Sequence, residues 1–257
     1  MSNEHDETQE FLDSLPELTE GDTFCFDCHP GVACFNACCS ELNLMLTPYD
    51  VMRLRSGLGM SSRAFLQNHA DLQVQPDTGL PMFRLRMDKT CANACPFVSP
   101  EGCTVYPDRP GACRTYPLGR ASQPGENGEA QERFFIVRED HCKGFKQGTV
   151  RTSDEWLEDQ GLEEYNRLND RYMSILANQR KTGAPAPMKK ANMAVLALYQ
   201  LDSFKDFIRD MGVLDRLELG PERRARIMEN EAARLEFAFD WLELILFGEC
   251  PNLEPKK

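Results

Sequence analysis

The chain gathers its cysteines into one region, and this clustering constrains it more than any other feature. Ten of its eleven cysteines lie between Cys25 and Cys142, in a chain of 257 residues. Packing alone gives no reason to collect so many thiols in under half of a chain, whereas thiolates are soft ligands that favour zinc or iron–sulfur clusters. The cysteine pattern therefore predicts a polythiolate metal site.

Composition and charge argue against several classes of protein. The net charge of −12 disfavours general nucleic-acid binding, which needs clustered Lys and Arg against phosphates. No stretch approaches the roughly 18 apolar residues of a membrane span. The acidic start lacks the basic and apolar parts of a secretory signal. We therefore expect a cytoplasmic protein with reduced thiols and with neither a nucleic-acid nor a membrane partner.

The character of the sequence changes along the chain. We expect an acidic disordered tail over 1–22, a cysteine-cluster metal-binding domain over 23–147, a helical region over 148–250 and a second tail over 251–257. The cysteine-rich part contains many Gly and Pro residues and lacks long periodic segments. The predicted fold class is α+β: a small irregular module of short helices and strands, followed by an all-α C-terminal region.

Local signals place several elements of the cysteine-rich part. A capping sequence predicts a helix over 47–56, and Ser61 is expected to cap a second short helix. Alternating apolar residues predict strands at 83–87 and 134–137. The intervening stretch 121–131 is expected to be a surface loop.

The C-terminal region shows helical signals. A capping box begins at Thr152, and apolar residues then recur at three- and four-residue steps over 156–176, which predicts one amphipathic helix. Ser203 is expected to cap a further helix. Pro221 is expected to open the last helix, and Gly248 to end it.

The cysteine spacing indicates a metal more clearly than it indicates which metal. Cys25 and Cys28 form one Cys-x-x-Cys pair, whereas a zinc ribbon would show two such pairs. Cys38 and Cys39 are adjacent, and neighbouring side chains diverge in most backbone conformations. Two interpretations stay open: these two thiols serve different metals, or one is a ligand while the other packs. This irregularity favours an iron–sulfur cluster over zinc by a small margin.

Two arginines lie beside the later cysteines. Arg109 and Arg114 place fixed positive charge next to thiolates, which would lower thiol pKa values and offset the charge of a cofactor. We therefore expect both to contribute to cofactor binding. The alternative is that they pair with Asp108 or Glu101 on the surface.

Ordered motifs over 24–145 resemble a known family. They are Cys28-His-Pro-Gly-Val-Ala-Cys34-Phe-Asn-Ala-Cys38-Cys39, Leu46-Thr-Pro-Tyr-Asp50, Cys95-Pro-Phe, Gly102-Cys-Thr-Val-Tyr106, Arg109-Pro, Cys113-Arg-Thr-Tyr-Pro117 and His141-Cys-Lys-Gly144. In these motifs the chain resembles the bacterial cysteine-cluster (YkgJ-like) family of zinc- or iron-chelating proteins. That family is similar, in this domain, to the flagellin lysine N-methylases.

The resemblance implies a ligand set. Carried over by position, the implied metal ligands are Cys28, Cys34, Cys38, Cys39, Cys95, Cys103, Cys113 and Cys142. Cys25, Cys91 and Cys250 fall outside this set, although Cys25 remains a reserve ligand because of its spacing to Cys28. Eight thiolates suit two four-ligand sites, or one cluster with additional reactive or structural thiols. His29 and His141 each neighbour a cysteine and are alternative fourth ligands.

Three functions follow from these observations. The first is a metal-binding protein that holds an iron–sulfur cluster or zinc. The second, implied by the resemblance alone, is a protein-modifying enzyme of the flagellin lysine N-methylase type, which would act on a protein substrate or partner. The third is a metal chelation or delivery protein. The sequence leaves open whether the chain is an enzyme.

Overall fold

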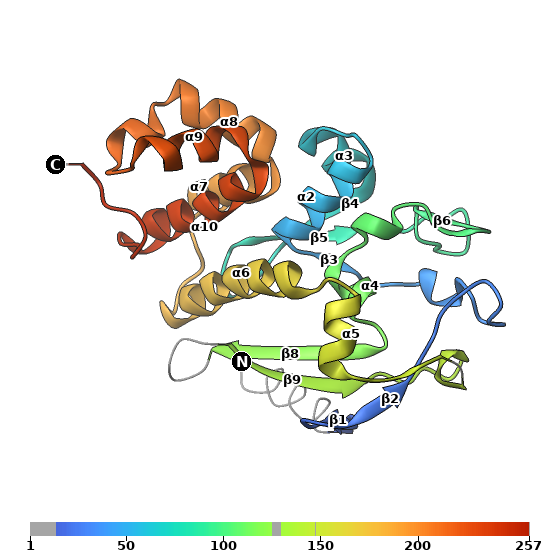
Figure 1. The fold of residues 1–257 in the computed structure, drawn as a ribbon. Helices are drawn as coiled ribbons and strands as arrows, with labels where there is room; N and C mark the ends of the chain where they lie inside the picture. Colours follow the sequence, from blue (N-terminus) through green and yellow to red (C-terminus); the bar gives the residue numbers. More distant parts are fainter. Residues whose placement is uncertain (1–13, 125–129, 147, 257) are drawn as a thin grey trace. The chain divides into compact units, whose positions relative to one another are not determined.

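The structure is a computed structural model, and it describes residues 14–124, 130–146 and 148–256. The expected α+β class is confirmed, with helices in the C-terminal part (Figure 1). The chain divides into two compact units, each made from two segments. Unit 1 is Met1–Leu42 with Met87–Asn166, and unit 2 is Asn43–Arg86 with Arg167–Lys257.

Unit 1 contains an antiparallel sheet in the order β1 (Glu17–Leu18), β9 (Ala130–Ile136), β8 (Leu118–Pro124). β8 and β9 lie side by side as long neighbouring strands (Figure 1). Their ends extend into the stretch 121–131, so the loop predicted there is wrong at its edges, while 125–129 lie outside the described residues. Within the predicted acidic tail, residues 1–13 also lie outside the described residues, and β1 is an edge strand paired with β9.

Shorter elements complete unit 1. β2 (Thr23–Cys25) pairs with β10 (Val150–Thr152), and β6 (Val98–Ser99) pairs with β7 (Gly102–Cys103). The helical elements are η1 (Ala37–Cys39), η2 (Tyr106–Asp108), α4 (Gly111–Thr115), η3 (Gly144–Lys146), α5 (Ser153–Asp159) and the start of α6 (Glu163–Lys181). Most of these elements are only two to five residues long, so the unit is irregular, as its Gly and Pro content predicts.

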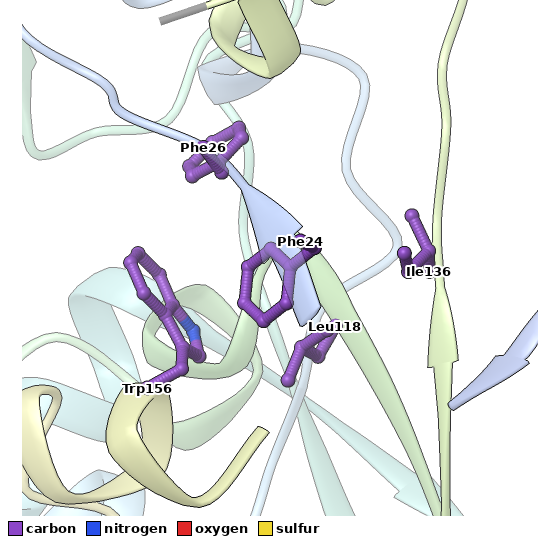
Figure 2. Packing of buried hydrophobic residues seen from close by; sticks show 5 residues of the cluster. All are labelled: Phe24, Phe26, Leu118, Ile136 and Trp156. Carbon is purple, nitrogen blue, oxygen red and sulfur yellow. The ribbon is translucent and has the colours of Figure 1, made fainter. Parts of the chain in front are cut away.

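An apolar cluster forms the core beneath these short elements. Figure 2 shows its members, Phe24, Phe26, Leu118, Ile136 and Trp156, which come from β2, its extension, β8, β9 and α5. The Phe26 and Trp156 rings meet edge to face, with centroids 5.7 Å apart. The Trp156 indole also donates a hydrogen bond to the Thr115 carbonyl at 3.0 Å. The cluster thus ties β2 and α5 to the segment that follows α4.

One predicted helix of the C-terminal region is in fact two. The expected capping box at Thr152 is present, with Glu155 as its partner, and it starts α5. α5 ends at Asp159, however, and α6 begins at Glu163. Gly161 lies between them with φ +61, in the left-handed region that ends helices. The apolar spacing continues across this break, which is why periodicity alone predicted a single helix.

Unit 2 combines a small sheet with helices. The antiparallel sheet has the order β3 (Met45–Leu46), β5 (Pro81–Leu85), β4 (Ala70–Val74). The predicted capping box of Thr47 and Asp50 is confirmed and starts α2 (Pro48–Gly57). Ser61 caps α3 (Ser62–His69), also as predicted.

The remaining helices of unit 2 follow α6 and a short linker. They are α7 (Met188–Ala194), the π-helical turn η4 (Val195–Tyr199), α8 (Leu201–Asp210), η5 (Val213–Arg216), α9 (Pro221–Glu229) and α10 (Glu231–Phe247). The predicted cap at Ser203 is wrong, because α8 begins two residues earlier. The predicted last helix is divided at Asn230, whose side chain accepts from the Ala233 N–H and caps α10. Gly248, with φ +83, ends α10 as predicted.

None of the described helices combines the length and the apolar character that a membrane crossing requires.

The core of unit 1 gives a first prediction. Phe26→Ala removes a ring that is 5% exposed and contacts Tyr116, Phe145 and Trp156. We expect the free energy of unfolding of unit 1 to fall by about 3–5 kcal/mol, because a cavity replaces a buried ring. The chain has two tryptophans, and the fluorescence of each reports the unfolding of a different unit, because Trp156 lies in unit 1 and Trp241 in unit 2. Denaturant unfolding followed by fluorescence in a Trp241→Phe background therefore measures unit 1.

Val150→Ala is the matched control for this prediction, because Val150 lies in the neighbouring strand β10 and is 62% exposed. We expect its effect to stay within about 0.5 kcal/mol. An unchanged unfolding midpoint for Phe26→Ala would show that the cluster is not the core of unit 1.

Candidate metal centre

All eight cysteines implied as ligands lie in unit 1, and no disulfide joins any of the described cysteines. Cys28 and Cys113 are exposed, whereas the other six are half-buried. Soft donors therefore gather in a region that is only partly open to solvent. Their contacts divide them into two groups.

The first thiol group consists of Cys28, Cys34, Cys38 and Cys142. The backbone N–H of Lys143, next to Cys142, donates to Cys34 Sγ at 3.1 Å. Burial, together with the negative charges of Cys38, Cys34 and Cys142, raises the pKa of Cys28 to about 11. Charges exert such an effect only over short distances, so these four thiols are neighbours.

The second thiol group consists of Cys39, Cys95, Cys103 and Cys113. The backbone N–H of Cys95 donates to the Cys39 carbonyl at 2.7 Å, and the β6–β7 hairpin brings Cys103 opposite Val98. The pKa of Cys39 is raised by its hydrogen bond with Cys38, by burial and by the charges of Cys38, Cys95 and Cys113. Burial and the charge of Cys103 raise the pKa of Cys95. The two cysteine-rich stretches of the sequence thus meet in space.

The two groups are joined through the adjacent residues Cys38 and Cys39. Both lie in the short turn η1, which Asn36 enters in the left-handed conformation with φ 69. Their thiols share a hydrogen bond that lowers the pKa of Cys38 to about 7 and keeps the proton on Cys39. Cys38 therefore ionises more readily near neutral pH than Cys28 or Cys39.

Arg109 lies beside the second thiol group. Its guanidinium is buried and donates to the Tyr106 carbonyl at 2.7 Å and to the Gln160 side chain. It also lies 3.7 Å from the centre of the Tyr106 ring. Burial lowers the pKa of Arg109, while the charges of Cys103 and Cys113 oppose this change. Arg109 is thus a fixed cation within electrostatic reach of two thiols.

Arg114 makes its hydrogen bonds to backbone carbonyls around the second thiol group. It donates to the carbonyls of Arg109 at 3.1 Å and Gln160 at 2.7 Å, and also to that of Pro107. Its guanidinium lies 4.8 Å from the centre of the Tyr165 ring. Arg114 therefore ties the Arg109 loop to the segment after α5. It can thus position the nearby thiols through the backbone carbonyls to which it donates.

The comparison with family models bears directly on this arrangement. A model named CxxCxxCC and described as a putative zinc- or iron-chelating domain matches residues 27–143. We call residues 27–143 the CxxCxxCC domain after this match. The chelating family predicted from the motifs is thus confirmed, whereas the link to the flagellin lysine N-methylases is not shown. The comparisons with curated proteins and with solved structures gave no match.

The donors of the CxxCxxCC domain suit zinc or iron. Eight thiols outside any disulfide, most of them half-buried, offer the soft ligands that both metals prefer. Among the described residues, one group of three possible metal ligands has its ligand atoms within 4.8 Å of one another, and it lies outside this domain. Its members are Asp240, Glu243 and Cys250. The thiols are therefore neighbours at a wider spacing, and their sulfur atoms would have to draw together around an ion.

The trio of Asp240, Glu243 and Cys250 lies outside the CxxCxxCC domain, in unit 2. Arg171 donates to Glu243 at 2.5 Å and to Asp240 at 2.9 Å. Arg223 donates to Asp240 at 2.9 Å as well. Two guanidinium groups thus already neutralise the carboxylates that a metal ion would need. We interpret this trio as a salt-bridge network that stabilises unit 2.

Tyr116 is a candidate site residue of the CxxCxxCC domain that the sequence analysis missed. Its hydroxyl is buried, and the Cys142 thiol lies within hydrogen-bonding reach of it. Burial raises its pKa, and the nearby Cys142 thiol raises it further. A buried hydroxyl beside a thiol can donate to sulfur once that sulfur is a thiolate. Its place in the motif Cys113-Arg-Thr-Tyr-Pro117 was the available signal.

The two histidines proposed as alternative ligands differ in position. The His29 Nδ1 atom accepts a hydrogen bond from the Gly31 N–H at 3.1 Å, within its own turn. His141 is exposed, and its Nε2 lies 3.2 Å from Glu139. Among the smaller influences on the pKa of Cys38, Glu139 raises it and His141 lowers it. His141 is therefore the histidine adjacent to the first thiol group.

The contrast between Cys38 and Cys28 gives a prediction for the reduced, metal-free protein. Cys38 has a pKa of about 7, so its thiolate forms as the pH rises through 7, whereas Cys28, with a pKa of about 11, stays protonated at pH 8. We expect iodoacetamide to modify Cys38 before Cys28 at pH 8, although Cys28 is the more exposed. Peptide mass spectrometry at several times measures the two rates.

Cys39→Ser provides the control for this prediction, because it weakens the hydrogen bond that contributes most to the low pKa of Cys38. We expect alkylation of Cys38 to slow in this variant. Faster modification of Cys28 in the parent would contradict the prediction and would mean that access controls the rate.

Proposed function

We propose that the chain binds a redox-active or structural metal through the eight thiolates of its CxxCxxCC domain, with an iron–sulfur cluster favoured over zinc. The observation that carries this proposal is the meeting of two distant cysteine segments, seen where the Cys95 N–H donates to the Cys39 carbonyl. Nothing in ordinary packing requires thiols from both segments to gather there. A metal that uses ligands from both segments accounts for the arrangement.

The surroundings of the thiols support the preference for iron. The Lys143 N–H donates to the Cys34 sulfur, and the buried Arg109 lies near Cys103 and Cys113. Hydrogen bonds to sulfur and nearby fixed charge are the means by which proteins adjust the potential of iron–sulfur clusters. A cluster bound by these residues would supply electron transfer, whereas zinc would contribute chiefly to folding.

Metal delivery is a second candidate, and one observation favours it. Each thiol group contains one exposed member, Cys28 in the first and Cys113 in the second. An acceptor's thiolate can bind the metal and displace an exposed thiolate ligand, so metal could pass from the domain to another protein. Rapid transfer of the bound metal to a chromogenic chelator would support delivery, and retention over hours would argue for a resident cofactor.

The identity of the metal is the central prediction. We expect protein purified without oxygen to be brown, with thiolate-to-iron charge-transfer absorbance and with iron and inorganic sulfide in comparable amounts. Elemental analysis, a sulfide assay and a visible spectrum measure this. Zinc without iron or sulfide, in protein from cells replete in both metals, would reverse the choice. The absence of both metals would contradict metal binding itself.

A pair of exposed cysteines tests the ligand set. We expect Cys113→Ser to lower the metal content and to reduce hydrogen-exchange protection in unit 1, because metal binding contributes to its folding. Cys91→Ser is the matched control, since Cys91 is equally exposed but lies outside the implied ligand set. It should keep the metal content and protection of the parent. Full metal in Cys113→Ser would remove Cys113 from the set.

A further inference from the structure

We infer that the CxxCxxCC domain holds two separate metal centres and that the chain divides its ligands between Cys38 and Cys39. The first centre would use the first thiol group (Cys28, Cys34, Cys38 and Cys142), and the second would use the second thiol group (Cys39, Cys95, Cys103 and Cys113). This inference rests on the proposed function and adds to it the number of centres and the ligands of each.

Hydrogen bonds of the backbone bring the segments of the first group together, independently of the charges on its thiols. The Lys143 N–H reaches Cys34 Sγ at 3.1 Å, which fixes Cys34 beside the residue that follows Cys142. The Asp27 N–H donates to the Gly144 carbonyl at 3.2 Å, which places the residue before Cys28 against the same segment. These hydrogen bonds hold the segments of Cys28, Cys34 and Cys142 together. Cys38, in η1, is the fourth member of the group.

A different set of contacts assembles the second group. Besides the bond from Cys95 to Cys39, the Glu41 N–H donates to the Asn93 carbonyl at 2.9 Å. The Asn36 side chain donates to the Ser99 carbonyl at 2.8 Å, which holds the η1 segment against the β6–β7 hairpin.

The remaining member, Cys113, enters through the arginine loop. Arg114, its neighbour in α4, donates to the Arg109 carbonyl at 3.1 Å. The Arg109 guanidinium, in turn, donates at 2.7 Å to the carbonyl of Tyr106, three residues after Cys103. These contacts connect the segment of Cys113 to the segment of Cys103.

The turn η1 is the point of division. Cys38 and Cys39 are consecutive, and the backbone on either side of them contacts different segments. The Ala37 N–H, just before Cys38, donates to the Cys34 carbonyl at 2.9 Å, whereas the Cys39 carbonyl accepts from the Cys95 N–H at 2.7 Å. Each side of the turn thus collects four thiols, which is the number that one tetrahedral zinc or one cubane cluster requires. The contact between Cys38 and Cys39 implies that the two centres are adjacent.

Cobalt(II) titration tests the division, whichever metal is native. Cobalt(II) alone is added without oxygen to the reduced, metal-free chain, and thiolate-to-cobalt absorbance is followed. We expect saturation at about two equivalents for the parent and at about one for Cys38→Ser and for Cys39→Ser. Cys38→Ser/Cys142→Ser, with both changes in one centre, should still bind about one equivalent. Cys38→Ser/Cys39→Ser, with one change in each, should bind none tightly.

The control is Cys25→Ser, because the Cys25 thiol donates to the Gly148 carbonyl at 3.3 Å and lies outside both groups. It should keep two equivalents. Saturation of the parent at one equivalent would overturn the two-centre inference, as would complete loss of binding in Cys38→Ser. A parent that binds no cobalt and contains no metal as purified would contradict the proposed function instead.

A second measurement uses only the parent chain, so it holds even if a variant misfolds. At one equivalent of cobalt, the chain is treated with N-ethylmaleimide and the protected cysteines are identified by mass spectrometry. We expect each singly loaded molecule to protect one of the two groups of four. Protection that mixes members of both groups, such as Cys34 with Cys103, would overturn the assignment.

Discussion

The hydrogen bond from the Cys95 N–H to the Cys39 carbonyl is the contact on which the candidate centre depends. The chain leaves unit 1 after Leu42 and returns to it at Met87, so a long stretch belonging to unit 2 separates the two cysteine segments. The bond closes this gap, with help from the isolated bridge between Ser40 and Ala94. Without such closure, thiols so far apart in sequence could not share a metal, because loop entropy opposes their meeting.

The two thiol groups rest on different supports. Tyr116 and Cys142 pack against the apolar cluster of Phe24, Phe26 and Trp156, so the first group adjoins a core that burial already stabilises. The second group depends on a hairpin whose strands are two residues long, and such short ladders are marginal by themselves. Bound metal would therefore contribute proportionally more order to the second group.

The sequence predicted features whose causes are local. The helix starts at Thr47, Ser61 and Thr152 depend on a cap and on residues within one turn, and all three are present. The breaks at Gly161 and Asn230 were missed because apolar periodicity continues across both. The gathering of thiols in one unit followed from composition and resemblance. The division that we infer followed from neither, since it depends on backbone contacts between distant segments.

Charge links the division of the thiols to the position of Arg109. Four thiolates around one divalent ion leave a net charge of about −2. Two such centres therefore add electrostatic repulsion to a chain whose net charge is already −12. The hydrogen-bond acceptors recorded for Arg109 are neutral oxygens of Tyr106 and Gln160. No carboxylate neutralises the guanidinium in those contacts, so its positive charge can stabilise the thiolates of Cys103 and Cys113. Burial destabilises the charged form of Arg109, whereas the thiolates of Cys103 and Cys113 stabilise it. Arg109 and the second group therefore favour each other's charged forms. No buried arginine occupies an equivalent position in the described contacts of the first group, where the Lys143 N–H donates to the Cys34 sulfur.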